Sequence, residues 1–281
     1  MKSIFYFSVI FLTALGLSIG LVQLLFPESN WQTNVQIAMQ SPSFAHIFGT
    51  DSLGRDLFLR TVHGAQMTLM MGCVCSLFSF FIGVIYGGIS AWLGKLTDQV
   101  MMRLMEVLMS LPQLVTIGLL VIFLANRGGG VSGLTGIFKL AFAISLGSWM
   151  SFARLTRNLV LKEKALLYVE AAVAVGSTPF RIFWREIGPN LAPSLMIMFG
   201  LQIPNFLLFE SLLSFTGLGI QPPLSSWGLL LQEGWKSMIA YPHVLLFPSL
   251  ILFLTVFSLN VIFEQLRRKV LRKFEPIDTH H

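Results

Sequence analysis

Few side chains in this 281-residue chain could carry out chemistry, and they lie far apart along the sequence. Its histidines form no HExxH motif and no other spacing that pairs metal ligands. They are His46, His63, His243, His280 and His281, of which the last two are expected to form a frayed tail. The stretch Gly88 to Lys95 resembles a phosphate-binding loop, but it has one residue too many between its glycines, and Leu96 replaces the magnesium-binding Ser or Thr. We therefore expect no catalytic residue, metal or cofactor in this chain, and any ATP to be hydrolysed elsewhere.

Three charged residues within or beside apolar stretches are further candidates. Arg103 and Glu106 are three residues apart, so on a helix they lie on one face, and this spacing predicts an ion pair. Glu210 lies within a long apolar run. It either hydrogen-bonds to the turn that follows, in a structural role, or it lines a path or gate.

A second charged group, Asp51, Arg55 and Asp56, follows a Gly-Thr pair and precedes an apolar run. One interpretation is a turn and a helix start, in which Asp51 caps the helix and Arg55 bridges to a neighbouring element. The other interpretation is a contact with another protein.

The composition then indicates which elements must hold these residues. Hydrophobic residues make up 54% of the chain and charged residues 11%, whereas an ordinary soluble domain carries about 25% charge. A helix needs about 20 apolar residues to cross a bilayer. Six runs meet or approach this length: 4–26, 67–93, 107–125, 140–153, 191–212 and 241–263. The sequence predicts an all-α membrane protein with about six transmembrane helices.

Details within these runs predict how the helices pack. Lys139 interrupts the fourth run, which makes it the weakest. Pro112 and Pro204 lie within or near the third and fifth runs and are expected to kink them. Small residues recur every three or four positions along the second run, a pattern that favours close helix approach. They are Gly72, Ser76, Ser79, Gly83, Gly87 and Ala91.

The lysines and arginines predict the orientation of the spans, because cytoplasmic loops carry an excess of them. One side holds Lys2, Lys95, Arg103, Arg154, Arg157, Lys162, Lys164, Arg181, Arg185, Arg267, Arg268, Lys269, Arg272 and Lys273. The other side holds only Arg55, Arg60, Arg127, Lys139 and Lys236. We therefore expect both termini in the cytoplasm. The net charge of +6 then reflects topology, and no nucleic-acid partner is expected.

The segment 156–192 is too charged to cross lipid and reads as two helices joined by a corner. The first is expected over 151–175 and to stop at Gly176. The second is expected to begin with Ser177 or Thr178 as its cap and Pro179 at its first position, and to end at Gly188–Pro189.

The short second helix is predicted to be amphipathic. Its apolar face comprises Phe180, Phe183, Trp184 and Ile187, and Arg181 and Arg185 line an adjacent face. The pattern alone leaves two interpretations equally open. The helix either anchors passively in the lipid interface or inserts into a groove of a soluble partner.

Four motifs, in this order, resemble those of one family, the second permease subunit of ATP-binding-cassette (ABC) importers for dipeptides, oligopeptides and nickel. The motifs are GTDSLGRD at 49–56; Asp98, Arg103, Glu106 and Pro112; YVEAA at 168–172 with Gly176, Pro189 and Asn190; and LSFTGLG at 213–219 with the following PP and SWG. The third resembles the family's EAA loop. The resemblance extends from about residue 49 to the C-terminus.

The resemblance implies a type I ABC importer permease fold with a cytoplasmic coupling helix that docks on an ATPase. The coupling residues it implies are Tyr168, Glu170, Ala171, Ala172, Gly176, Pro179, Phe180, Arg181, Phe183, Trp184, Arg185, Pro189 and Asn190. The expected partners are a homologous permease, two ATP-binding subunits that carry ATP and Mg, a periplasmic or extracellular solute-binding protein, and membrane lipid. Asp51, Arg55 and Asp56 could then contact the partner permease or the solute-binding protein.

On this interpretation the chain lies in a bacterial inner membrane and has four parts. These are an anchor helix at 1–26, a periplasmic segment at 27–66, a five-helix permease core at 67–266 and a basic cytoplasmic tail at 267–281. The solute is left open between dipeptides, oligopeptides, nickel chelates and glycan fragments. An ion-coupled secondary transporter is the alternative, but it predicts inverted internal repeats, and none is evident. A membrane enzyme predicts clustered nucleophiles and bases, which are also not evident.

Overall fold

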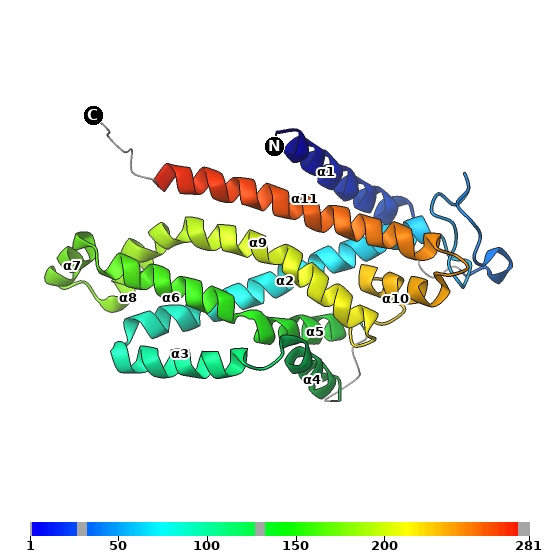
Figure 1. The fold of residues 1–281 in the computed structure, drawn as a ribbon. Coiled ribbons are helices and arrows are strands. Elements are labelled where there is room, and N and C mark those ends of the chain that lie inside the picture. Colours follow the sequence, from blue (N-terminus) through cyan, green and yellow to red (C-terminus); the bar gives the residue numbers. More distant parts are fainter. Residues whose placement is uncertain (1, 27–32, 127–132, 275–281) are drawn as a thin grey trace. The chain divides into compact units, whose positions relative to one another are not determined.

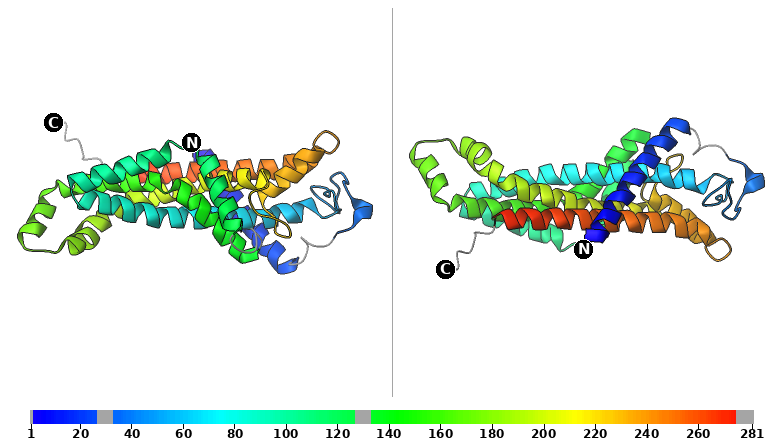
Figure 2. Two further views of the ribbon diagram at one scale, coloured as in Figure 1. Left: turned by 90° about the horizontal axis from the view of Figure 1, so that it is seen from below. Right: turned by 90° about the horizontal axis from the view of Figure 1, so that it is seen from above.

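The computed structural model describes residues 2–26, 33–126 and 133–274, and the long elements within these ranges are all helices. His280, His281 and Arg127 lie outside the described residues. Figure 1 labels the helices and Figure 2 shows them from two further sides. In chain order they are α1 (Lys2–Leu25), the 3₁₀ turn η1 (Val35–Ile37), α2 (Leu57–Trp92), α3 (Lys95–Met109), α4 (Gln113–Asn126), α5 (Gly133–Ser148), α6 (Met150–Lys164), α7 (Leu167–Ala174), α8 (Pro179–Arg181), the π-helix η2 (Ile182–Ile187), α9 (Gly188–Phe215), α10 (Trp227–Ser237) and α11 (His243–Phe274).

The expected all-α fold is confirmed, and the six predicted spans correspond to four single helices and two bent pairs. Four helices are long and apolar enough to cross a membrane: α1, α2, the continuous helix Pro179–Phe215, and α11. Two pairs reach that length only together, and they are α3 with α4, bent by 88°, and α5 with α6, bent by 49°. The expected kink at Pro112 is therefore present as a break between α3 and α4. Pro204 lies inside α9, and the helix continues through it without a break.

Three predicted boundaries are wrong. The second span begins at Leu57 rather than residue 67, because the side chain of Asp56 caps the helix through the backbone N–H of Leu59 at 2.9 Å. The helix expected over 151–175 is two helices, since Leu166 has an extended conformation (φ −92°, ψ 144°) that separates α6 from α7. The helix expected to end at Gly188–Pro189 instead continues into α9.

The continuation through Gly188 and Pro189 has a local cause. The Gly188 N–H donates to the Phe183 carbonyl five residues earlier, as in a π-helix. Pro189 has no N–H to donate and would disturb the preceding turn of a regular α-helix. The wider π turn accommodates it, so the chain from Pro179 to Phe215 is one helix of 37 residues.

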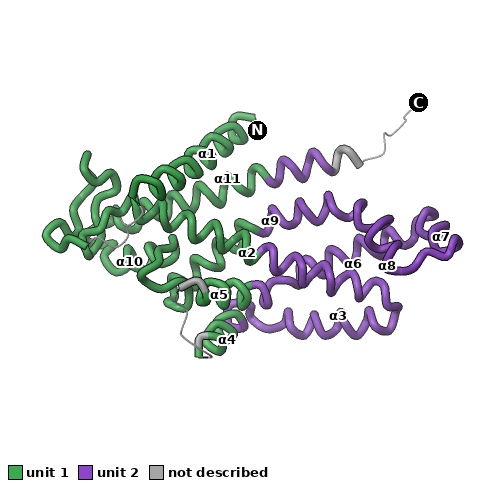
Figure 3. The backbone as a smooth tube through the Cα atoms, turned by 180° about the vertical axis from the view of Figure 1, so that it is seen from behind, with its two compact units in different colours: residues 1–75, 117–144, 203–262 green, residues 76–116, 145–202, 263–281 purple. Residues whose placement is uncertain are grey.

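The chain forms two compact units, each with its own core (Figure 3). Unit 1 comprises residues 1–75, 117–144 and 203–262, and unit 2 comprises residues 76–116, 145–202 and 263–281. Helices α2, α9 and α11 each contribute residues to both units. The core of unit 1 surrounds the fully buried Trp227, and a core of unit 2 surrounds Val160, Ile182 and Ile187.

The small residues of α2 allow close helix contacts within each unit. In unit 1, a Cβ added at Gly72 would meet the side chains of Leu207 and Ile203. In unit 2, a Cβ at Gly83 would lie 2.6 Å from the Trp149 carbonyl oxygen. Ser76 there donates to the Phe199 carbonyl at 3.0 Å. The close approach predicted from the small-residue stripe is confirmed.

Candidate functional site

The predicted coupling residues form a helical corner in unit 2, which we call the elbow and define as residues 165–190. Helix α7 ends in a Schellman motif: the Gly176 N–H donates to the Val173 carbonyl at 2.9 Å, and the Ser177 N–H donates to the Ala172 carbonyl at 3.0 Å. Gly176 has a φ of +81°, which strains any residue with a Cβ. The left-handed backbone conformation of Gly176 therefore explains why the helix ends there, as predicted.

The second arm of the elbow begins as the sequence predicts. The side chain of Thr178 accepts a hydrogen bond from the Arg181 N–H at 3.4 Å, and Pro179 occupies the first helical position. This places Thr178, rather than Ser177, at the cap. Proline suits the position because its missing N–H would have no helical partner there.

The inner face of the elbow is anchored to the core of unit 2. Ile182 and Ile187 are buried, and Phe183 packs edge-on against Trp92 with ring centroids 6.5 Å apart. Lys164 donates to the Ala91 carbonyl at 2.9 Å and lies over the Trp92 ring. These contacts hold the elbow against α2.

A polar clamp joins both arms of the elbow. The Tyr168 hydroxyl donates to Glu163 Oε2 at 2.5 Å, and the Asn190 amide donates to the same carboxylate at 3.3 Å and to the Tyr168 oxygen at 3.1 Å. Burial, with the hydrogen bond to Glu163, raises the pKa of Tyr168 above its usual value. Tyr168 and Asn190 thus hold α7 to the start of α9. Glu163 was not among the predicted residues, because it lies outside the motif.

The outer face of the elbow is exposed and combines aromatic and charged side chains. Phe180 is 74% exposed and Trp184 58%, and their rings lie 6.3 Å apart. The remaining exposed members of the predicted set are Glu170, Ala171, Gly176, Pro179, Arg181, Arg185, Pro189 and Asn190, whereas Ala172 is half-buried against the core.

The predicted four-residue apolar face is therefore wrong in half of its members. Phe183 and Ile187 face the core, and only Phe180 and Trp184 face outward. The π turn has more residues per turn than an α-helix, so side chains three residues apart diverge, and Phe180 and Phe183 no longer share a face, nor do Trp184 and Ile187. The 3.6-residue period used for the prediction does not hold over 182–187.

A second group of predicted residues forms an ion-pair cluster in unit 1, which we call the four-charge cluster: Asp51, Arg55, Arg60 and Glu233. Asp51 is buried, and its Oδ1 accepts from the N–H groups of Leu53 (2.8 Å) and Arg55 (2.9 Å). Its Oδ2 accepts from Arg55 Nε at 2.7 Å and Arg60 Nη1 at 2.5 Å. Burial opposes ionisation, but the Arg60 charge and the other donors outweigh it, so the pKa of Asp51 lies below its usual 3.8.

Two members of the four-charge cluster were missed by sequence reasoning. Arg60 is 2% exposed and donates to both carboxylate oxygens of Glu233, at 2.5 and 3.2 Å. Arg55 also reaches Glu233, at 3.5 Å, so the predicted bridge from Arg55 to a neighbouring element is confirmed. Glu233 lies on α10, 173 residues from Arg60, and local spacing carries no signal for such a pair.

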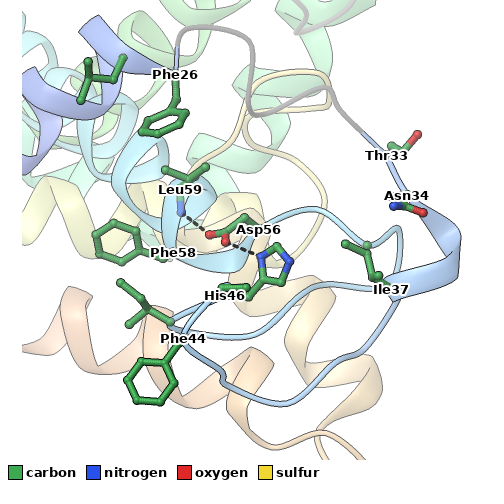
Figure 4. Close-up of a pocket in the computed structure, with 13 residues that line it drawn as sticks. Phe26, Thr33, Asn34, Ile37, Phe44, His46, Asp56, Phe58 and Leu59 are labelled. Atoms are coloured by element: carbon green, nitrogen blue, oxygen red, sulfur yellow. Dashed lines mark hydrogen bonds and ion pairs between the residues drawn. The ribbon is translucent and has the colours of Figure 1, made fainter.

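The structure corrects the cap assignment and reveals a nearby cavity. Asp51 orders a loop, and Asp56 rather than Asp51 caps α2. His46 Nδ1 lies 2.8 Å from Asp56 Oδ2, at the wall of an open cavity of about 880 Å³ (Figure 4). Phe44, Phe58 and other apolar side chains line much of the remaining wall.

Glu210 and the Arg103–Glu106 pair take the simpler of their predicted arrangements. Glu210 is fully buried, and its Oε1 accepts from the Ser214 hydroxyl at 2.7 Å. That hydroxyl in turn accepts from the Ile220 N–H at 3.0 Å, so Glu210 supports the turn after α9. Arg103 and Glu106 form an exposed ion pair at 2.9 Å.

The comparisons with known proteins agree with this architecture. Residues 79–275 match the family model described as "Binding-protein-dependent transport system inner membrane component".

Several relatives extend the match over most of the chain. The oligopeptide transport system permease protein OppC of Escherichia coli K12 is 38% identical, over 92% of this chain and 84% of its own length. OppC of Bacillus subtilis is 35% identical, over 84% and 74%. The dipeptide permease protein DppC of B. subtilis is 37% identical, over 79% and 67%. This chain therefore belongs to the family of binding-protein-dependent inner membrane permeases of ABC importers.

A solved structure supports the fold independently. A chain of the inward-facing MetNI methionine ABC transporter superposes with a TM-score of 0.60 at 20% identity, covering 76% of this chain and 97% of that one. The expected type I importer fold is confirmed. The alternative of an ion-coupled secondary transporter is not favoured.

Proposed function

We propose that this chain forms half of the translocation pathway of an ATP-driven importer for peptides or a related small solute. The names of its relatives support a peptide, since both oligopeptide and dipeptide permeases match it over most of its length. Its expected partners are a homologous permease, a solute-binding protein and two ATP-binding subunits, which carry ATP and Mg.

The coupling proposal rests on the two faces of the elbow, of which one packs against the core and the other is exposed. Its inner face is fixed by the buried Ile182 and Ile187 and by the clamp of Tyr168, Glu163 and Asn190. Its outer face leaves Phe180 and Trp184 exposed, beside exposed arginines. Large aromatic and arginine side chains of this kind are enriched among the residues that dominate protein interfaces. We propose that this outer face docks on the ATPase.

The helix that continues from the elbow would transmit the motion of the ATPase to the spans. The helix from Pro179 to Phe215 runs without a break from the proposed docking face into the fifth span. A displacement of α8 by closing ATPases would then be passed along this continuous helix into α9. The solute path would change the side that it faces by alternating access.

The orientation is part of the same proposal. Docking on a cytoplasmic ATPase requires the elbow, and the basic residues around it, to face the cytoplasm. The lysine and arginine distribution supports this orientation. Under the same proposal both termini lie in the cytoplasm and the four-charge cluster lies outside.

Replacing Trp184 with alanine tests the docking face. Trp235 on α10 is the matched control, since it is also a tryptophan and is 56% exposed. In the assembled transporter in vesicles, W184A is expected to lower ATP-dependent peptide uptake about tenfold or more, as a lost interface anchor does, while W235A leaves it near the wild-type level. Equal uptake by both variants, with both complexes assembled, would refute docking through this face.

A further inference from the structure

The two bent helix pairs contact each other within unit 2. Helix α3 ends at Met109 and α4 begins at Gln113, and α5 ends at Ser148 next to α6. The Gln113 amide donates to the Ser148 hydroxyl at 2.7 Å and to the Gly147 carbonyl at 3.2 Å. The Gln113 side chain thus links the break between α3 and α4 to the break between α5 and α6. We call residues 108–116 and 146–151 the double bend.

Both breaks fall within apolar runs of the sequence, at 110–112 in the run 107–125 and at 149 in the run 140–153. Helix α3 has 15 residues and α4 has 14, and each is shorter than the roughly 20 residues that cross a bilayer core. Only the joined pair is long and apolar enough. From this length and composition we infer that the break at 110–112 lies within the span, where lipid supplies no water to the backbone groups at the helix ends. Such backbone is tolerated only where protein buries it or where it lines a water-filled space.

The double bend borders a cavity that is large enough to hold water. A cavity of about 130 Å³ lies between the two breaks, enough for several water molecules. Its polar lining consists of Gln113, Thr116, Ser148 and Ser151, and the guanidinium of Arg154 contacts the sulfur of Met109 in its wall at 3.0 Å. Leu108 and Met150 are among its apolar wall residues. Ser151 and the neighbouring Met109 are exposed.

The chemistry of this lining suits one kind of ligand. Amide and hydroxyl groups can both donate to and accept from the main-chain amides of a peptide. Leucine and methionine side chains accept varied apolar groups, since methionine is flexible and polarisable.

We propose that the double bend lines the solute path and contacts the uncharged main chain of a transported peptide. This inference rests on the proposed transport function and adds to it the residues of this chain that meet the solute. A lipid tail or a helix of the partner permease could cover the same surface, and the experiment below separates these outcomes.

Cysteine accessibility in the assembled transporter tests the proposal. The native thiols are removed by Cys73→Ser and Cys75→Ala, and Ser151→Cys or Thr116→Cys is added. Ile85→Cys on α2 is the control, because Ile85 lies in an apolar span and is 57% exposed. A charged, membrane-impermeant methanethiosulfonate is the probe. Thiolates form in water and not in hydrocarbon, so labelling at Ser151→Cys is expected to be at least about tenfold faster than at Ile85→Cys.

Uptake after labelling gives the second measurement. A bulky group attached inside the path is expected to block peptide uptake by S151C and to leave ATP hydrolysis measurable, whereas labelled I85C transports normally. Labelling of S151C only by a lipid-soluble maleimide, labelling by neither reagent, or unchanged uptake after full labelling would overturn the proposal. Uptake by the unlabelled variants tests the transport function separately, so the two can fail independently.

Discussion

At the scale of single residues, the four-charge cluster shows how a charged motif becomes buried. Asp51, Arg55, Arg60 and Glu233 carry two positive and two negative charges, and each carboxylate contacts both arginines. Mutual neutralisation offsets part of the cost of removing these charges from water. Removing one charged partner from this buried cluster is therefore expected to destabilise the fold far more than removing one partner of an exposed ion pair.

The substitution Asp51→Asn tests this expectation. The amide keeps an acceptor for the N–H groups of Leu53 and Arg55 but leaves Arg60 with a single carboxylate partner. Breaking a buried pair costs about 3–5 kcal/mol, so the melting temperature of the purified complex should fall clearly. Glu106→Gln is the control, because its pair with Arg103 is exposed and is worth about 0–1 kcal/mol. Equal melting temperatures for the two variants would show that the buried charge of Asp51 does not stabilise the fold.

The pKa of Asp51 gives a related pH dependence. Because the folded pKa lies below the usual 3.8, the folded state favours the ionised carboxylate. The stability it contributes is fully present above that usual value and is lost as the pH falls through the lower, folded pKa. In an acid titration followed by melting temperature, the wild type should therefore lose its advantage over D51N progressively below about pH 4. A difference that stays constant with pH would show that the charge of Asp51 does not contribute.

At the scale of elements, the elbow depends on one backbone conformation. Among the residues that the structure describes, apart from the two chain neighbours of Gly176, none has an atom within 4 Å of a Cβ built there, so the main effect of adding one is the backbone strain of a φ of +81°. The same space surrounds Gly20 of α1, whose φ is helical. Comparing alanine substitutions at Gly176 and Gly20 therefore separates the effect of backbone conformation from the effect of packing.

Gly176→Ala is therefore expected to lower uptake, because the left-handed conformation costs an L-residue about 1–2 kcal/mol and the α7–α8 corner would change. Gly176→Asn should restore part of the activity, since asparagine tolerates this conformation. Gly20→Ala should be neutral. Peptide uptake and nucleotide hydrolysis by the four complexes would measure this, and normal coupling in G176A would show that the corner does not transmit motion.

At the scale of the whole molecule, the proposed topology can be tested directly. A reporter that is active only outside the cytoplasm, inserted after Ala45, should be active, and the same reporter fused after residue 281 should not. The reason is the excess of lysine and arginine beside the spans on the side of the elbow. The reverse pattern would reject docking of the elbow on a cytoplasmic ATPase.

The amino-acid sequence determined the features that depend on local chemistry. Long apolar runs predicted the spans, Pro112 predicted a break, and Gly176 and Pro179 predicted the corner, because hydropathy and backbone preferences act over a few residues. The family was also within reach, since the residues of each of its motifs lie close together along the sequence. Only the tertiary structure decided the partners of Arg60 and Glu233, the clamp on Glu163 and the inward turn of Phe183. Arg60 and Glu233 are far apart in sequence, so local patterns do not predict their pairing. The clamp on Glu163 and the inward orientation of Phe183 depend on a corner and a π turn whose geometry is set by packing, and a fixed helical period does not predict that geometry.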